Sequence, residues 1–246
     1  MSKEKKDYLV VKHNSLINAK SEEPYTLNQM KLICHLISHI KPEDTNFETK
    51  EVLLKDLNFD SIESGSNYTK LTSEFVQLLK KPFKVPGSMY WVNWVSAIGY
   101  SDGIIKYRFD PCLVPYLLEL KDNFTFYQLK NILSLKRVYS IRLYELLLQN
   151  LVIGSRTIEL EELRALLNIP KSYKNNDITT LVKDIQQELK EKTDISFTFK
   201  PIKRVREFAS IEFKIKQVKQ IKQKLIPANT SLRSSLKSMR VSDNDQ

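Results

Sequence analysis

The stretch "SYKNNDITTLVKDIQQELKEKT" (residues 172–193), followed directly by "DISFTFKPIKRVREFASIEFKIKQ" (residues 194–217), decides the fold. In the first part, apolar residues recur three and four positions apart, which predicts an amphipathic helix. In the second part, apolar and polar residues alternate on both sides of "KPIKRVRE", which predicts two strands joined by a loop. The apolar helix positions are Ile178, Leu181, Val182, Ile185 and Leu189, and the alternating strand positions are Ile195, Phe197, Phe199, Ala209, Ile211, Phe213 and Ile215.

An internal sequence repeat extends this pattern to the rest of the chain. "YTLNQMKLI" (residues 25–33) resembles "FTFYQLKNI" (residues 124–132). Each copy is followed by an expected long amphipathic helix, a short polar segment, a second helix and β-rich sequence. Three helices and then a β-hairpin form a winged helix, a helix-turn-helix to which a β-hairpin called the wing is added. The offset of about 100 residues is the size of a small domain.

These patterns predict an α+β fold of two tandem winged-helix domains related by internal duplication. In the first unit, "MYWVNWVSAIGY" and "IIKYRF" flank Ser101-Asp102-Gly103, where Asp-Gly signals a tight turn between strands. "YSIRLYELLLQNL" (residues 139–151) is apolar nearly all round and predicts the central buried helix of the second unit. We expect an N-terminal domain over residues 1–120, a C-terminal domain over residues 121–216, and a basic, mobile tail over residues 217–246.

The charge of the chain is unevenly distributed. The formal net charge is +10, and residues 200–246 hold 12 Lys and Arg against 4 Asp and Glu. Such an excess favours an anionic partner, with nucleic acid as the first candidate. The alternative is a solvated tail that only aids solubility.

In a winged helix the third helix enters the major groove of DNA and the wing lies along the backbone, so residues 172–193 are expected to be the recognition helix. Lysine pairs with phosphate or guanine, asparagine bonds adenine, and the helix N-terminus favours phosphate. Asp177 is expected to cap the helix, and Asp184, Glu188 and Glu191 to lie off the DNA. The alternative is an ordinary solvated helix face. The expected DNA contacts are Lys171, Ser172, Lys174, Asn175, Asn176, Thr179 and Lys183 on the helix, and Lys200, Lys203, Arg204 and Arg206 on the wing.

The matching helix of the first unit is less basic. We expect weaker contacts there, mostly to the DNA backbone, and a role for the sheet of this unit in dimerisation. Its core stripe is Tyr68, Leu71, Phe75, Leu78 and Leu79, and its candidate DNA contacts are Ser66, Asn67, Thr69, Lys70 and Ser73.

Several other classes of site find little support. The chain has five glycines and no phosphate-binding P-loop motif, so neither an ATPase nor a bound cofactor is expected. The histidines are His13, His35 and His39, which do not form the His-apolar-His pair of a metal-dependent nicking enzyme, and we expect no catalytic residue. His35 and His39, next to Cys34, are a weak zinc candidate, because the apolar stripe places both histidines on the polar face.

Two further patterns bear on partners and compartment. Trp91 and Trp94, with Tyr90 and Tyr100, could stack on single-stranded DNA, but aromatics at this spacing more often fill a sheet core or an interface. The two cysteines suit a reduced, cytoplasmic protein. We expect neither a signal peptide nor a membrane span, since no stretch approaches about 18 consecutive apolar residues.

Five segments together resemble one protein family: "VVKHNSLINAK", "YTLNQMKLICHLI", "YLLELKDNFTFYQLKNILSLKRVYSIRLYELLLQ", "LEELRALLNIP" and "LKEKTDISFTF". Their order and spacing look like a plasmid replication initiator of the iteron-binding, theta-replicating type, over roughly residues 9–216. The resemblance implies tandem winged-helix domains that bind direct repeats of origin DNA (iterons) as monomers and melt adjacent AT-rich DNA. It also implies a homodimer that binds an inverted operator and represses its own gene, and recruitment of the host initiator and the replicative helicase.

Three hypotheses remain open from the sequence. The first is a non-catalytic initiator of plasmid replication that binds double-stranded DNA. The second is a dimeric winged-helix transcriptional repressor without a role in initiation. The third is an enzyme such as a nickase, which the missing ligand set disfavours. The family has no fixed string of base-reading residues, so the DNA contacts above are assigned by their positions on helix and wing.

Overall fold

The structure, a computed structural model, describes residues 8–57, 65–205 and 207–218, and for residues 65–70 and 207 it describes the backbone alone. The tail predicted for residues 217–246 therefore lies, from residue 219 on, outside the described residues. The same holds for Arg206 and for the side chains of Ser66, Asn67, Tyr68, Thr69 and Lys70.

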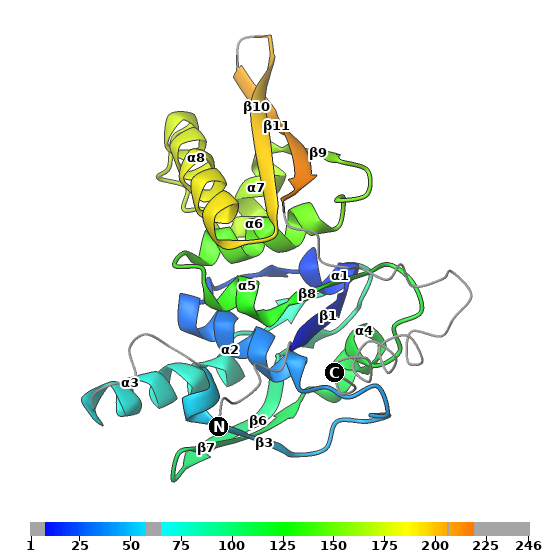
Figure 1. Cartoon of the computed structure of the whole chain (residues 1–246), viewed down its shortest axis with the longest axis vertical. Helices are drawn as coiled ribbons and strands as arrows, with labels where there is room; N and C mark the ends of the chain where they lie inside the picture. The colour runs from blue at the N-terminus through cyan, green and yellow to red at the C-terminus, as the bar shows by residue number, and fades with distance from the viewer. Residues whose placement is uncertain (1–7, 58–64, 206, 219–246) are drawn as a thin grey trace.

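The N-terminal half of the chain contains a helix, a strand, two further helical segments and a hairpin in the expected order (Figure 1). A separate small sheet, β2–β4–β5, precedes the hairpin. The elements are β1 (Leu9–His13), α1 (Asn14–Ile17), β2 (Lys20–Ser21), α2 (Leu27–Ser38), β3 (Lys50–Leu53), η1 (Leu54–Leu57), α3 (Gly65–Val76), η2 (Gln77–Lys80), β4 (Phe83–Lys84), β5 (Trp91–Val92), β6 (Val95–Ser101), β7 (Ile104–Phe109), η3 (Pro111–Leu113) and α4 (Val114–Leu117).

The C-terminal half repeats that order with a longer third helix and a longer hairpin. In both halves the single strand pairs antiparallel with the second strand of the hairpin, which forms sheets of order β3–β7–β6 and β9–β11–β10. The elements are β8 (Phe124–Gln128), α5 (Leu129–Leu133), α6 (Val138–Leu148), β9 (Ser155–Glu159), α7 (Leu160–Leu167), α8 (Asn175–Lys192), β10 (Ile195–Arg204) and β11 (Glu207–Gln217).

The turn between β6 and β7 lies at the predicted residues. Asp102 and Gly103 have φ angles of 51° and 78°. Positive φ at both central residues is what a two-residue type I′ hairpin turn requires, and Asp-Gly is a favoured pair for it. The predicted turn and the strands beside it are therefore confirmed, but the segment expected as one strand, residues 89–100, is divided between β5 and β6, which belong to different sheets.

Helix α6 forms the spine of the molecule, because it contacts α1 and α2 on one side and α7 and α8 on the other. Its buried residues include Ile141, Leu143, Leu146 and Leu147, each 0% exposed, which confirms the predicted buried helix. Strand β1 also pairs antiparallel with β8, with Val10 opposite Tyr127. The domain boundary predicted near Lys121 falls between these paired strands in the sequence, and it stays a prediction.

The two copies of the internal sequence repeat differ in structure. In the first copy, the Thr26 side chain accepts the Gln29 N–H and the Gln29 side chain accepts the Thr26 N–H, and this capping box starts α2. In the second copy the matching residues form β8. The long helix expected to follow it is split into α5 and α6, so that expectation is wrong. The Lys136 N–H in the break donates to Glu188 Oε1 at 2.6 Å, which stabilises the interruption.

The wing is longer than the sequence suggested. Lys200 to Arg204, expected in a loop, are the last residues of β10, and Lys200 lies opposite Glu212. A register shift follows at Ile202 and Lys203, and Val205 turns the chain with φ of 60°. Pro201 is tolerated in the strand because β10 is an edge strand, where a missing N–H need not interrupt a ladder. Figure 1 shows this hairpin projecting beyond the rest of the molecule.

Candidate nucleic-acid interface

Helix α8 is held by the apolar stripe that the sequence predicts. Ile178, Val182, Ile185 and Leu189 are each 0% exposed, and Leu181 is half-buried. The stripe packs on α6 and β10, so the opposite face of α8 points to solvent. Full burial of an aliphatic side chain stabilises by about 1.5–3 kcal/mol, so four such residues anchor α8 firmly.

The leading end of α8 carries the predicted polar and basic side chains. Lys171, Ser172, Lys174, Asn176 and Lys183 are exposed, and Asn175 and Thr179 are half-buried. The carboxylate of Asp177 accepts the Lys174 N–H at 2.7 Å, which confirms the expected capping role. The helix N-terminus adds a partial positive charge next to these lysines, so this end favours a phosphate.

Arg164 on α7, which the sequence analysis did not single out, fixes the turn before α8. Its Nη2 donates to Tyr173 O at 2.8 Å and lies 3.4 Å from Asn175 Oδ1. The Asn175 side-chain oxygen is therefore already engaged by protein, whereas the Asn176 side chain is exposed. The position of Arg164 depends on how α7 packs beside α8, and no local sequence signal reports such packing.

The wing presents cations beside α8. Lys200, Lys203 and Arg204 are exposed, and Lys203 Nζ lies 5.2 Å from the centre of the Phe208 ring. Arg204 Nη2 pairs with Glu159 Oε1 at 2.9 Å, with both side chains half exposed or more. An exposed pair of this kind contributes at most about 1 kcal/mol, so a phosphate can compete for Arg204. Arg206 lies outside the described residues.

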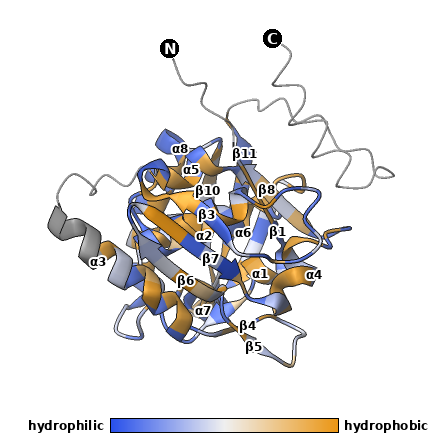
Figure 2. Ribbon diagram, turned by 90° about the horizontal axis from the view of Figure 1, so that it is seen from below, coloured by the Kyte–Doolittle hydropathy of each residue, from blue (hydrophilic) through white to orange (hydrophobic). Residues whose placement is uncertain are grey.

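The matching helix α3 is attached to the start of α2. Glu74 accepts hydrogen bonds from the side chains of Thr26 and Asn28, and its carbonyl accepts Gln29 Nε2 at 2.8 Å. Leu71, Phe75 and Leu78 are buried, as the predicted stripe requires, and Leu79 is half-buried. Of the candidate contacts on this helix, Ser73 is described and is exposed. Figures 1 and 2 both place α3 and α8 toward the same side of the molecule.

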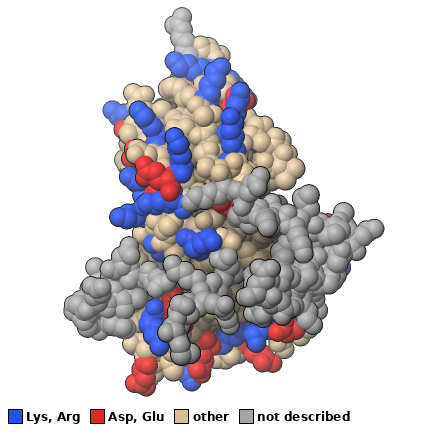
Figure 3. All heavy atoms as spheres, in the orientation of Figure 1, with Lys and Arg blue, Asp and Glu red and all other residues tan. Residues whose placement is uncertain are grey.

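Basic side chains dominate the part of the visible face that α8 and the wing occupy. Figure 3 shows Lys and Arg gathered over the upper part of the molecule, where α8 and the β10–β11 hairpin lie, with fewer Asp and Glu among them. The exposed residues of the helix end and the wing are called here the α8–wing surface, which is defined by Lys171, Ser172, Lys174, Asn176, Lys183, Lys200, Lys203 and Arg204.

Two family models match this chain. Residues 9–148 match the model described as "Initiator Replication protein, WH1", and residues 159–215 match the model described as "Initiator Rep protein, WH2". The first range alone covers more than half of the chain. The chain belongs to the initiator replication protein family. This initiator therefore has the two tandem winged-helix domains that the sequence predicts.

Solved structures similar to the initiator support the same fold. The Pi initiator protein in complex with iteron DNA aligns with a TM-score of 0.67 and 18% sequence identity, over 87% of this chain and 99% of that one. Domains 2 and 3 of RctB align with a TM-score of 0.50 and 10% identity, over 82% of this chain and 86% of that one. A search of curated proteins finds no match.

The far end of α8 in the initiator has a structural role. The Glu188 carboxylate is nearly buried and accepts the Lys136 N–H and the Ser140 hydroxyl, each at 2.6 Å. It also pairs with Arg137 and Lys192. Burial raises the pKa of Glu188, but these hydrogen bonds and charges outweigh burial, and the pKa lies below its ordinary value. Glu188 therefore joins α8 to the start of α6, and it is unavailable for binding other groups.

One histidine of the predicted pair is buried, and the other, His39, is half-buried. His35 was expected on the polar face of its helix, but it is 1% exposed, so that expectation is wrong. The reason is that α2 packs against β1 and α5, and residues 29–38 of this helix are all buried, so it has no exposed polar face. Within the described residues, no group of three or more His, Cys, Asp and Glu side chains forms a metal site.

The aromatic residues of the first unit divide between core and surface. Trp94 is 5% exposed and packs on Phe83 with ring centres 4.8 Å apart, so it fills the core. Tyr90, Trp91 and Tyr100 are each at least 40% exposed. In the part of the chain that the structure describes, no helix is both long and apolar enough to cross a bilayer.

Proposed function

We propose that this initiator starts plasmid replication by binding direct repeats (iterons) of double-stranded origin DNA, without catalysing a reaction. The observation that carries the proposal is the basic α8–wing surface, combined with the placement of α3 and α8 on one side of the molecule. The similarity to the Pi initiator protein, whose structure contains iteron DNA, supports it. The molecule would act in the cytoplasm, where plasmid DNA is found.

Each part of the surface has a separate task in this proposal. Helix α8 enters the major groove, where Lys174, Asn176 and Lys183 reach base edges and phosphates. The wing lies along the backbone through Lys200, Lys203 and Arg204, which fix orientation without reading sequence. Helix α3, with Ser66, Asn67, Thr69, Lys70 and Ser73 as candidate contacts, adds weaker contacts on the next turn of the duplex. Two grooves one turn apart correspond to a repeat of about 20 base pairs.

The origin-opening step and the partners belong to the same proposal. Repeated binding is proposed to help melt adjacent DNA and to recruit the host initiator and the replicative helicase. A homodimer in equilibrium with the monomer is proposed to bind an inverted operator and repress the gene. Strand β6 is the edge strand of the N-terminal sheet, and Ser96 and Gly99 on it are exposed, so a second copy of the chain could add to this edge.

The domain limits are proposed on the same grounds. Residues 1–120 would serve dimerisation and auxiliary DNA contacts, residues 121–216 would read the DNA, and residues 217–246 would add non-specific affinity. The ranges matched by the two family models instead meet between residues 148 and 159, so limited proteolysis followed by mass spectrometry can locate the boundary.

Footprinting on the DNA that flanks the gene tests the proposed function. We expect protection of tandem direct repeats of about 20 base pairs, with two protected patches per repeat on one side of the duplex. A repressor without a role in initiation would instead protect only an inverted site, and its removal would leave plasmid replication intact. Protection of no repeated sequence at all contradicts both. Relaxation of supercoiled origin DNA in the presence of a divalent metal would indicate an enzyme.

A further inference from the structure

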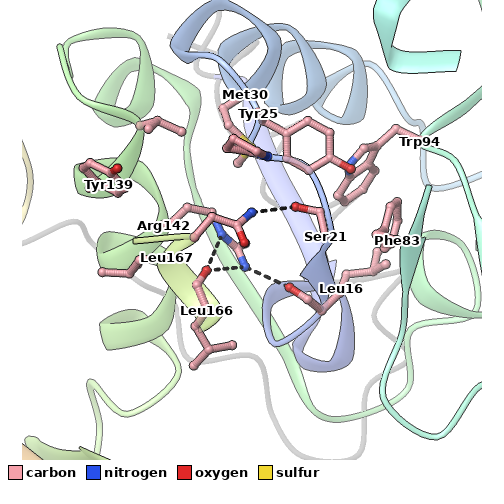
Figure 4. Close-up of a pocket in the computed structure, with 14 residues that line it drawn as sticks. Leu16, Ser21, Tyr25, Met30, Phe83, Trp94, Tyr139, Arg142, Leu166 and Leu167 are labelled. Atoms are coloured by element: carbon pink, nitrogen blue, oxygen red, sulfur yellow. Dashed lines mark hydrogen bonds between the residues drawn. The ribbon is translucent and has the colours of Figure 1, made fainter. Parts of the chain in front are cut away.

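Arg142, on α6, contacts the backbone of both winged-helix domains. Its Nη2 donates to Ile17 O at 2.9 Å and to Ala19 O at 3.1 Å, both in the N-terminal domain. Nη2 and Nε each also lie 3.4 Å from Leu166 O, in the last turn of α7 in the C-terminal domain. Figure 4 shows the guanidinium directed at the Leu166 carbonyl between the two domains. One side chain therefore links the two.

A buried network holds the guanidinium in this position. Arg142 Nη1 lies 3.3 Å from Glu145 Oε2, and the Glu145 side chain is 0% exposed. The other carboxylate oxygen accepts Lys12 Nζ at 2.6 Å and the Tyr127 hydroxyl. Lys12 and Tyr127 come from the paired strands β1 and β8, so the network ties Arg142 to this strand pair, in which β1 belongs to the N-terminal domain. A guanidinium restrained on one edge by a carboxylate keeps its remaining donors in a fixed plane.

The junction between the two domains around Arg142 contains one further hydrogen bond and a small cavity. Asn168, which ends α7 with φ of 53°, donates to the Ser21 hydroxyl at 2.8 Å. A cavity of about 50 Å³ remains beside Arg142, lined in part by Tyr25, Trp94 and Leu167. Apolar packing therefore does not fill the junction, and directional polar contacts carry much of its geometry.

We propose that Arg142 is a positioning residue that sets the angle and distance between α3 and α8, so that both helices meet the same side of one duplex. The inference rests on the proposed function for its DNA consequence, but the geometry can be tested without DNA. Lysine keeps the charge beside Glu145, yet its single ammonium cannot bridge three carbonyls and a carboxylate in one plane. Arg142→Lys therefore loosens the domain orientation while it preserves the ion network.

The first experiment measures the distance between the domains by electron spin resonance. Spin labels are attached to Ser73→Cys on α3 and Gln187→Cys on α8, both exposed, in a Cys112→Ser background, and the buried Cys34 stays unlabelled. We expect one narrow distance distribution in the parent and at least a twofold broader one with Arg142→Lys. Arg108→Lys, at a surface arginine bonded to Ser96, is the matched control and keeps the narrow distribution.

The second experiment uses unlabelled full-length protein and the repeat that the wild type protects. We expect Arg142→Lys to bind the whole repeat at least tenfold more weakly, and to bind the half protected by the C-terminal domain as the parent does. An unchanged distance distribution, an unchanged affinity for the whole repeat, or an equal loss on the half-repeat would overturn the inference. If Arg142→Lys does not fold, Arg142→Gln, which keeps an amide donor, is measured instead. A wild type that binds no repeat refutes the proposed function, while the distance measurement still decides whether Arg142 sets the orientation.

Discussion

Glu145 and Lys12 form an ion pair in the core, where the side chains are 0% and 2% exposed. Burial raises the pKa of the Glu145 carboxyl, but the charges of Lys12 and Arg142 outweigh burial and hold the pKa below its ordinary value. For Lys12, burial lowers the pKa, but the contacts with Cys34 and Glu145 raise it more. Both groups are therefore charged at neutral pH. Removing Glu145 leaves Lys12 without its carboxylate partner, whereas removing Lys12 still leaves Glu145 paired with Arg142.

We predict that Glu145→Gln lowers the free energy of unfolding by about 3–5 kcal/mol, because Lys12 then stays buried without a counter-charge. Lys12→Met combined with Glu145→Gln should cost less than the sum of the single changes, since the pair is removed together. Urea unfolding of the four proteins measures this coupling. Additive effects of the two substitutions would show that the two charges do not depend on each other.

A second residue-scale prediction concerns His35. Burial, and after it the neighbouring His39, lower the pKa of His35 to about 3. Below about pH 6.5 the unfolded chain takes up a proton here that the folded chain excludes, so the stability present above this pH is lost as pH falls. One such group lowers the free energy of unfolding by about 2 kcal/mol between pH 7 and pH 5.

Urea unfolding at both pH values compares the wild type with His35→Phe, which keeps a ring against Tyr8 and His39. We expect the loss between pH 7 and pH 5 to be smaller in the variant by about 2 kcal/mol. An equal loss in both proteins would mean that His35 is protonated in the folded state.

At the scale of elements, the features that depend on local sequence were predicted correctly, and the features that depend on long-range contacts were not. The alternation of Phe197 and Ile211 and the Asp102-Gly103 turn define strands and a turn within a few residues, so both hairpins were predictable. The split between α5 and α6 was not, because it depends on Glu188, which lies 52 residues after Lys136 in the sequence. The extension of β10 past Pro201 likewise depends on its partner strand.

The candidate interface was predictable to a similar extent. The positions of Lys174, Asn176 and Lys183 follow from helix periodicity and the apolar stripe. The engagement of Asn175 by Arg164 and the pairing of Arg204 with Glu159 do not, because each partner comes from another element. Burial of His35 was missed for the same reason, since the chain that covers α2 is distant in the sequence.

At the scale of the whole molecule, two winged helices are held on a shared spine, with α3 and α8 toward one side (Figures 1 and 2). Helix α6 provides that spine, since it packs on α1 and α2 as well as on α7 and α8. The sequence assigned α6 to the second unit alone, because periodicity shows that a helix is buried and does not show what buries it. The basic residues of the α8–wing surface are where we propose that a duplex binds.

The central claim is that the leading end of α8 binds this duplex, and a double substitution tests it most directly. Affinity for DNA that carries the protected repeat is measured as a function of salt for the wild type, for Lys174→Ala with Lys183→Ala, and for a control, Lys121→Ala with Lys190→Ala. All four lysines are exposed, but the control pair lies away from the leading end of α8.

We predict that the first pair weakens binding by about tenfold or more and reduces the salt slope by up to about 2, since each lost phosphate contact removes about 0.9. The control pair should change the affinity by less than about threefold, because these lysines lie away from the proposed contact and salt screens their attraction to the DNA. Equal losses in the two double variants, or an affinity and salt slope that match the wild type in the first, would contradict the account.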